Sequence, residues 1–142
     1  MHSPLLRTLR HQHLDLISDL DRVRRLVEEG ADHVFMELRR FRITLMEHLA
    51  MEDATLYPAL NRATRVRPDL ARRLGDHLQE LAALQGAACD FFDRCAAEGA
   101  LDDPLRLEFT RLTKAIHLRI DREEDLLQLV FQSFQWNDDT LH

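Results

Sequence analysis

The sequence is poor both in residues that break helices and in residues that favour strands. Its 142 residues include only 4 glycines and 4 prolines, and aromatic residues make up 6% of the chain. Hydrophobic residues reach 45% and charged residues 31%, as in ordinary globular proteins. A chain of this length has room for one domain with a sizeable core. We therefore expect one domain built from long helices.

Further absences exclude whole classes of protein. The formal net charge is −6, so the chain lacks the cationic surface that non-specific nucleic-acid binding requires. No run approaches the roughly 18 uninterrupted apolar residues of a membrane span. The first ten residues carry charge and lack a long apolar core, unlike a signal peptide. The two cysteines, Cys89 and Cys95, point in different directions from one predicted helix and cannot pair, so a reducing, cytoplasmic location is predicted.

Helix breakers divide the chain into four segments, each with apolar residues at the 3–4 spacing of a helix that buries one face. The predicted helices cover residues 4–28, 32–58, 68–98 and 104–132. Ser3 and Asp32 are the predicted caps of the first two, and Pro58 is expected to kink or end the second, there or a turn beyond. Because the loops are short, consecutive helices should be antiparallel neighbours. The sequence thus predicts an all-α, up-down-up-down antiparallel four-helix bundle over residues 1–132, with a polar tail at 133–142.

Each predicted helix carries one histidine on or beside its buried stripe. The four are His13, His48, His77 and His117. A single core histidine is usually structural and hydrogen-bonded, but a bundle core penalises unpaired polar groups, so one histidine per helix indicates a shared purpose. With a rise of about 1.5 Å per residue, all four fall within about two helical turns along the predicted bundle.

Two carboxylates follow these histidines at helical spacing. Glu52 comes four residues after His48, and residues i and i+4 share one face of a helix. Asp121 stands in the same relation to His117. A buried carboxylate is costly unless it is paired or bound to a metal, and Glu52 lies on the stripe itself. Asp121 has neighbouring arginines as alternative partners, and Glu124, one heptad after His117, is the rival fourth-helix ligand ranked behind it.

The six predicted ligands offer four imidazoles and two carboxylates. That number exceeds the four ligands of a structural zinc site. Bundle cores that supply histidine and carboxylate from facing helices commonly hold two iron or manganese ions. Two non-haem iron ions are therefore the predicted cofactor, with manganese or zinc as alternatives. Open positions on a redox metal are where dioxygen, peroxide or nitric oxide would bind.

The segment from His48 to Leu60 resembles the signature of haemerythrin-like (HHE) domains. That signature is a histidine, a glutamate four positions on, and then an aliphatic-aromatic-proline run, which is Leu56-Tyr57-Pro58 here. His13 and the leucines after it resemble the first-helix motif of the family. His77 stands where a third-helix ligand is expected, and the similarity extends over about residues 5–131.

The resemblance implies a di-iron centre with carboxylate bridges from Glu52 and Asp121 and terminal imidazoles from the four histidines. Two positions depart from the oxygen-carrying haemerythrins. Those carriers have two histidines four apart on the third helix, whereas Arg73 and Leu81 flank His77 here. The fourth-helix carboxylate is aspartate rather than the frequent glutamate. The resemblance is accordingly to the wider HHE group rather than to the carriers.

Three functions follow as hypotheses. The first is a module that binds or senses dioxygen, nitric oxide or iron at the metal and passes any signal to a protein partner. The second is a di-iron oxidase or peroxide-consuming enzyme, which needs a pocket beside the metal. The third is a metal-free helical bundle that binds a protein partner, loosely similar to the bacterial regulators of sigma factor. The core position of Glu52 favours the first over the third, and a binding module is preferred to an enzyme.

Overall fold

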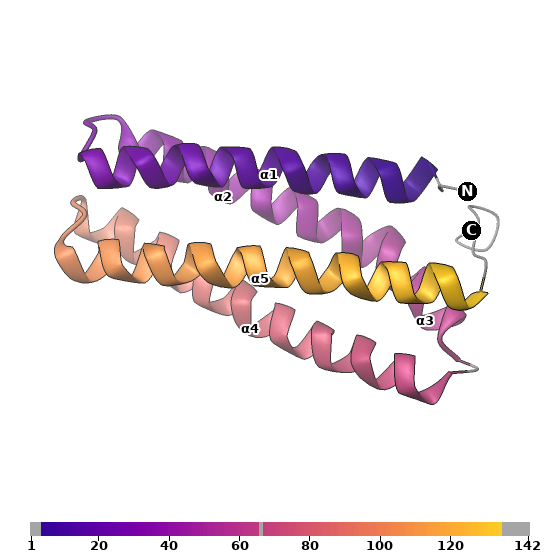
Figure 1. Cartoon of the computed structure of the whole chain (residues 1–142). Coiled ribbons are helices and arrows are strands. Elements are labelled where there is room, and N and C mark those ends of the chain that lie inside the picture. The colour runs from indigo at the N-terminus through magenta and orange to yellow at the C-terminus, as the bar shows by residue number, and fades with distance from the viewer. Residues whose placement is uncertain (1–3, 66, 135–142) are drawn as a thin grey trace.

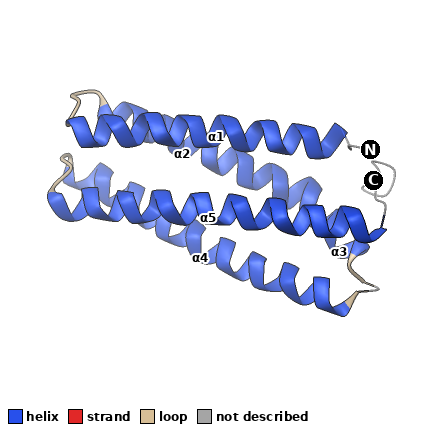
Figure 2. Cartoon of the chain, viewed as in Figure 1, coloured by secondary structure: helices blue, strands red, loops and turns tan. Residues whose placement is uncertain are grey.

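The computed structural model describes residues 4–65 and 67–134, and all regular structure in that part of the chain is helical (Figure 2). The elements are α1 (Pro4–Glu29), α2 (Val34–Met51), a π-helical turn η1 (Glu52–Leu56), α3 (Tyr57–Ala63), α4 (Pro68–Glu98) and α5 (Asp103–Phe134). Because α2, η1 and α3 follow one another without a break, the described residues form four helical segments. The all-α prediction is confirmed.

The four helical segments pack side by side. α1 contacts α2 and α5, while α4 contacts α2 and α5 (Figure 1). The α1–α2 and α4–α5 connections lie at one end, which we call the loop end, whereas α3 lies at the opposite end (Figure 1). This alternation of direction is compatible with the predicted up-down-up-down bundle. Within the described residues, no helix has a stretch both long and apolar enough to cross a bilayer.

The helix ends follow the predicted breakers in most places. Gly30 and Gly99 have φ values of 66° and 68°, the left-handed conformation that ends α1 and α4 and that favours glycine. The predicted cap Asp32 is wrong, because α2 begins after His33 without a side-chain cap bond. The predicted cap Ser3 lies outside the described residues. The start of the predicted tail, residues 133 and 134, belongs to α5, and the rest of it lies outside the described residues.

The core changes character along the bundle. Toward the loop end it is aromatic: Phe91 packs against Phe92 and Phe109 with ring centroids 5.4 and 5.5 Å apart, and Phe41 lies 6.5 Å from Phe92. Offset and edge contacts of this kind add to the hydrophobic gain of burial. Toward the α3 end, the same helices bury histidines and carboxylates. We call these two parts the aromatic half and the polar half.

Candidate metal centre

Four polar side chains converge in the polar half of the bundle. They are His13 from α1, His48 from α2, Glu52 from η1 and Glu123 from α5. Each offers one potential ligand atom, and these atoms all lie within 4.8 Å of one another. His13, Glu52 and Glu123 are buried, and the His48 side chain is 9% exposed. Segments far apart in the sequence thus place two imidazoles and two carboxylates around one point.

The distances inside the cluster run between imidazoles and carboxylates. His13 Nε2 lies 2.9 Å from Glu123 Oε1 and 3.7 Å from Glu52 Oε2. His48 Nε2 lies 3.3 Å from Glu52 Oε1, as expected for residues i and i+4 on one helix. The rings of His13 and His48 meet edge-on, with centroids 5.2 Å apart. Among the described residues, the ion-pair partners of both glutamates are imidazoles rather than arginine or lysine.

The other oxygen of Glu123 faces a second pair of buried side chains. The Tyr57 hydroxyl donates a hydrogen bond to Glu123 Oε2. His77 Nε2 lies 3.3 Å from the same oxygen and 3.2 Å from the Tyr57 hydroxyl. Tyr57 and His77 are only 4% and 5% exposed. The carboxylate of Glu123 therefore stands between two groups of potential ligands, with one oxygen toward each.

The π-helical turn explains how Glu52 and Tyr57 reach the same core. In a regular α-helix, residues five apart point about 140° away from each other. Here the backbone N–H of Tyr57 bonds to the carbonyl of Glu52, which widens the turn by one residue and brings the two side chains toward one side. Pro58 favours this distortion, because it has no N–H to donate to Ala54 and its ring would clash with that carbonyl.

Burial and neighbouring charges set the protonation of the centre. Burial alone would lower the pKa of His13, but the nearby carboxylates of Glu123 and Glu52 outweigh it and raise that pKa to about 9. Burial raises the pKa of Glu52. Burial acts in the same direction on Glu123, but the imidazoles of His13 and His77 prevail and hold the pKa of Glu123 well below its usual range.

Several ligand atoms of this cluster lack any hydrogen bond although they are buried. They include Nε2 of His13, Oε2 of Glu52 and Oε1 of Glu123. The short distances between these atoms therefore arise without the alignment of a hydrogen bond. Polar atoms removed from water without a partner are costly, whereas a cation among them would satisfy all of them together. The donor set of imidazole nitrogen and carboxylate oxygen fits a transition-metal ion.

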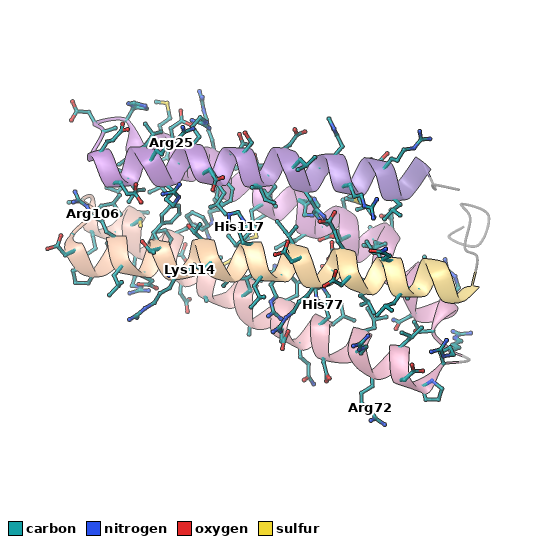
Figure 3. The ribbon with its side chains drawn as sticks, in the orientation of Figure 1. Arg25, Arg72, His77, Arg106, Lys114 and His117 are labelled. Carbon is teal, nitrogen blue, oxygen red and sulfur yellow. The ribbon has the colours of Figure 1, made fainter. Side chains whose placement is uncertain are left out.

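Three of the sequence-predicted residues, His13, His48 and Glu52, lie together in this cluster. His77 lies beside it, against Glu123. His117 does not reach the cluster: its side chain is 36% exposed and its Nε2 lies 3.4 Å from Asp21 Oδ1. Figure 3 shows it nearer the loop end than His77.

Asp121 is also placed away from the cluster, because it is exposed on the outer face of α5. The reason is helical phase. Asp121 and Glu123 are two residues apart, so they point about 200° apart around the helix axis. The rival Glu124 lies closer, with Oε1 3.9 Å from His13 Nδ1, which is beyond hydrogen-bond distance.

Sequence reasoning missed Glu123, although the sequence carried a sign of it. The buried stripe of α5 passes through Ile116 and Ile120 and resumes at Leu127. Glu123 fills the gap, three residues after Ile120 and four before Leu127, so it occupies a core position as Glu52 does. Tyr57, named above only as part of the family signature, also contacts the centre through Glu123, and only the structure reveals this.

A buried cluster of histidines and carboxylates between helices is typical of metal-binding helical proteins. The chain matches the model of the hemerythrin HHE cation binding domain family over residues 5–129. It belongs to this family, which confirms the resemblance seen in the sequence. No curated protein and no solved structure matches the chain itself.

Proposed function

We propose that the protein is a non-haem iron protein in which an up-down-up-down bundle holds two iron ions and binds or senses dioxygen or nitric oxide there. One ion would be held by His13, His48, Glu52 and Oε1 of Glu123. The other would be held on the Oε2 side of Glu123, with His77. The observation that carries the proposal is the set of buried ligand atoms of His13, Glu52 and Glu123 that have no hydrogen bond.

The chain's own residues determine what such a centre can do. Iron bound here would supply open coordination positions and a change of oxidation state. The site side chains His13, Glu52, His77 and Glu123 are themselves buried, and Glu123 holds its negative charge between His13 and His77. Two carboxylates offset part of the charge of the two cations, which a purely imidazole site would leave uncompensated. Five residues for two ions leave positions for a small ligand.

Metal content and ligand binding test this proposal directly. The full chain is loaded with Fe(II) under argon, the bound iron is counted, and the visible spectrum is followed on addition of nitric oxide and, separately, of air. We expect two irons per chain and a spectral change with at least one gas. A chain that stays free of metal after reconstitution would overturn the proposal.

Matched histidine variants sharpen the test. His13→Ala removes a residue of the cluster and should lower bound iron. His117→Ala removes a histidine of the neighbouring helix that pairs with Asp21 instead, and it should leave bound iron unchanged. Asp121→Ala should behave like His117→Ala, because Asp121 is exposed. Equal iron loss in all three variants would count against the ligand set proposed here.

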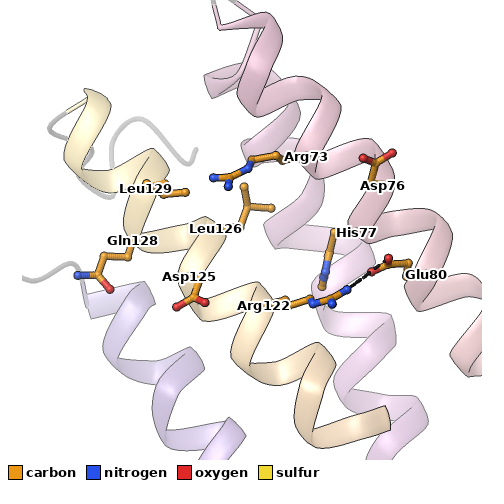
Figure 4. A pocket seen from close by; sticks show the side chains of 9 residues that line it. All are labelled: Arg73, Asp76, His77, Glu80, Arg122, Asp125, Leu126, Gln128 and Leu129. Atoms are coloured by element: carbon orange, nitrogen blue, oxygen red, sulfur yellow. Dashed lines mark hydrogen bonds and ion pairs between the residues drawn. The ribbon is translucent and has the colours of Figure 1, made fainter.

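A pocket of about 670 Å³ between α4 and α5 favours a second candidate, a di-iron oxidase or peroxide-consuming enzyme. His77 lines this pocket (Figure 4). Because His77 also contacts Glu123, the pocket adjoins the proposed centre. Arg73, Arg122 and Asp125 give it a polar mouth, and Leu126 and Leu129 form an apolar wall. Arg122 bonds to Glu80 across it at 3.1 Å.

Filling the pocket distinguishes this candidate from simple ligand binding. Leu129 is only partly buried, so Leu129→Trp should occupy the pocket without disrupting the centre. If the protein consumes peroxide through this pocket, the variant should keep its iron and lose turnover. Equal turnover in both proteins would show that the reaction does not use this pocket, and no turnover in either would leave the binding function as the better account.

A further inference from the structure

We propose that Tyr57 is a ligand of the second ion, so that the Tyr57 oxygen, His77 Nε2 and Glu123 Oε2 form one cation subsite. This inference rests on the proposed function and deepens it. It makes a tyrosine oxygen from α3 a metal ligand, beside the single imidazole that α4 offers through His77.

The geometry of these three atoms carries the inference. His77 Nε2 lies 3.2 Å from the Tyr57 oxygen and 3.3 Å from Glu123 Oε2, and the same oxygens are in direct contact with each other. Ligand atoms about 2.0–2.2 Å from one metal ion lie about 3 Å apart from each other, so the two distances from His77 Nε2 have the length of a coordination edge. All three side chains are at least nine-tenths buried.

The fold places Tyr57 there through a departure from regular α-helical bonding. The π-helical turn from Glu52 to Leu56 departs from α-helical bonding immediately before Tyr57. Such turns are rare and occur frequently at functional sites. Here the turn connects the two groups of potential ligands, because Glu52 is its first residue and Tyr57 directly follows its last. Without the extra residue, Tyr57 would point away from Glu52.

The charge balance of the subsite is consistent with this role. In the absence of a cation, the Tyr57 hydroxyl donates a hydrogen bond to Glu123. A metal ion reverses the local electrostatics, and protic ligands release their protons to solvent when they bind. Tyr57 would then contribute one negative charge beside Glu123, where His77 contributes none.

The test uses the fact that Tyr57 is the only tyrosine in the chain. Wild type and Tyr57→Phe are loaded with Fe(II) under argon and oxidised with ferricyanide. Bound iron is then counted, and visible absorption and resonance Raman spectra are recorded. We expect wild type to show a phenolate-to-iron charge-transfer band with tyrosinate ring modes. Tyr57→Phe should lose both and bind its second ion ~10-fold or more weakly.

A hydroxyl elsewhere in the core provides the matched control. Thr113 is buried and donates to the Phe109 carbonyl at 2.9 Å, away from the centre. Thr113→Val should therefore keep both ions and the tyrosinate spectrum, which shows that losing a buried hydroxyl is not itself the cause. Circular dichroism on Tyr57→Phe checks that the helices remain formed.

The outcomes separate this inference from the proposed function. Two irons in wild type without tyrosinate modes would overturn the inference and leave the function standing. Unchanged affinity for both ions in Tyr57→Phe would do the same. Loss of the second ion in that variant, without tyrosinate modes in wild type, would make Tyr57 a positioning residue for Glu123 and also overturn it. No iron in wild type would overturn the function and the subsite together.

Discussion

Buried carboxylates occur in both halves of the bundle, but they are satisfied in different ways. Near the loop end, Glu37 is buried and Arg22 donates to it at 2.6 Å, which lowers its pKa. In the polar half, Glu52 and Glu123 contact imidazoles, and each has a buried oxygen without a hydrogen bond. One half thus neutralises its acid with the protein's own cation. The other half places two acids beside imidazoles, a donor set that a metal cation would fit.

The aromatic half should carry more of the fold's stability than the polar half. Phe91 is fully buried among Phe92 and Phe109, so Phe91→Ala should destabilise the metal-free protein by ~3–5 kcal/mol. Urea denaturation in the presence of a chelator measures this. Each folded chain should nevertheless keep its full metal content. A loss of metal by folded Phe91→Ala would show that the two halves are not independent.

Glu123→Ala should break the polar half instead. Because Glu123 faces both ligand groups, its removal should weaken iron binding by ~100-fold or more, given that even outer partners of a metal site are worth 10–100-fold. Equilibrium titration with Fe(II) under argon measures the affinity. Glu37→Ala is the matched control: it removes a buried acid that has an arginine, and it should retain iron binding. Equal iron affinity in both variants would refute the contrast drawn between the two halves.

Replacing His48 and Glu52 together by leucine should make the core of the polar half more apolar, as it is in the aromatic half. Exchanging buried charged groups for apolar ones of similar size is often stabilising by about 1–4 kcal/mol. The double variant should therefore be more stable than wild type without metal and should gain less stability from added iron than wild type does. Thermal melts with and without Fe(II) measure both effects. If the metal-free variant melts below metal-free wild type, the polar cluster stabilises the fold by itself.

Metal binding should depend on pH, because the metal-free cluster holds a proton on His13 that a metal ion must displace. His13 has its pKa raised from 6.5 to about 9, so its proton stabilises the metal-free fold fully below pH 6.5, and this stabilisation disappears as pH rises through 9. A metal must displace that proton, so affinity should increase by up to ~10-fold per pH unit between pH 7 and 9. Calorimetry in buffers of different ionisation enthalpy counts the released proton. No proton release at pH 7.5 would contradict this assignment.

The sequence predicted most of the architecture because helix periodicity and breakers act locally. The glycines at 30 and 99 end helices where expected, and the histidines of the first three helices lie in the polar half. The fourth helix was harder. His117 and Asp121 share a face, but that face is turned toward Asp21 and solvent. Spacing fixes which residues share a face, whereas packing against α1 and α4 decides which face is buried.

By itself, the sequence determined that the chain is helical, which segments are helices, and that histidine and glutamate occupy core positions where leucine is expected. These properties depend on contacts within a few residues. Only the tertiary structure decided that Glu123, rather than Asp121, completes the cluster and that Tyr57 joins it. Both outcomes depend on the direction in which a side chain points around its helix axis. A π-helical turn changes that direction for the residues after it, and the packing of neighbouring helices decides which direction faces the core.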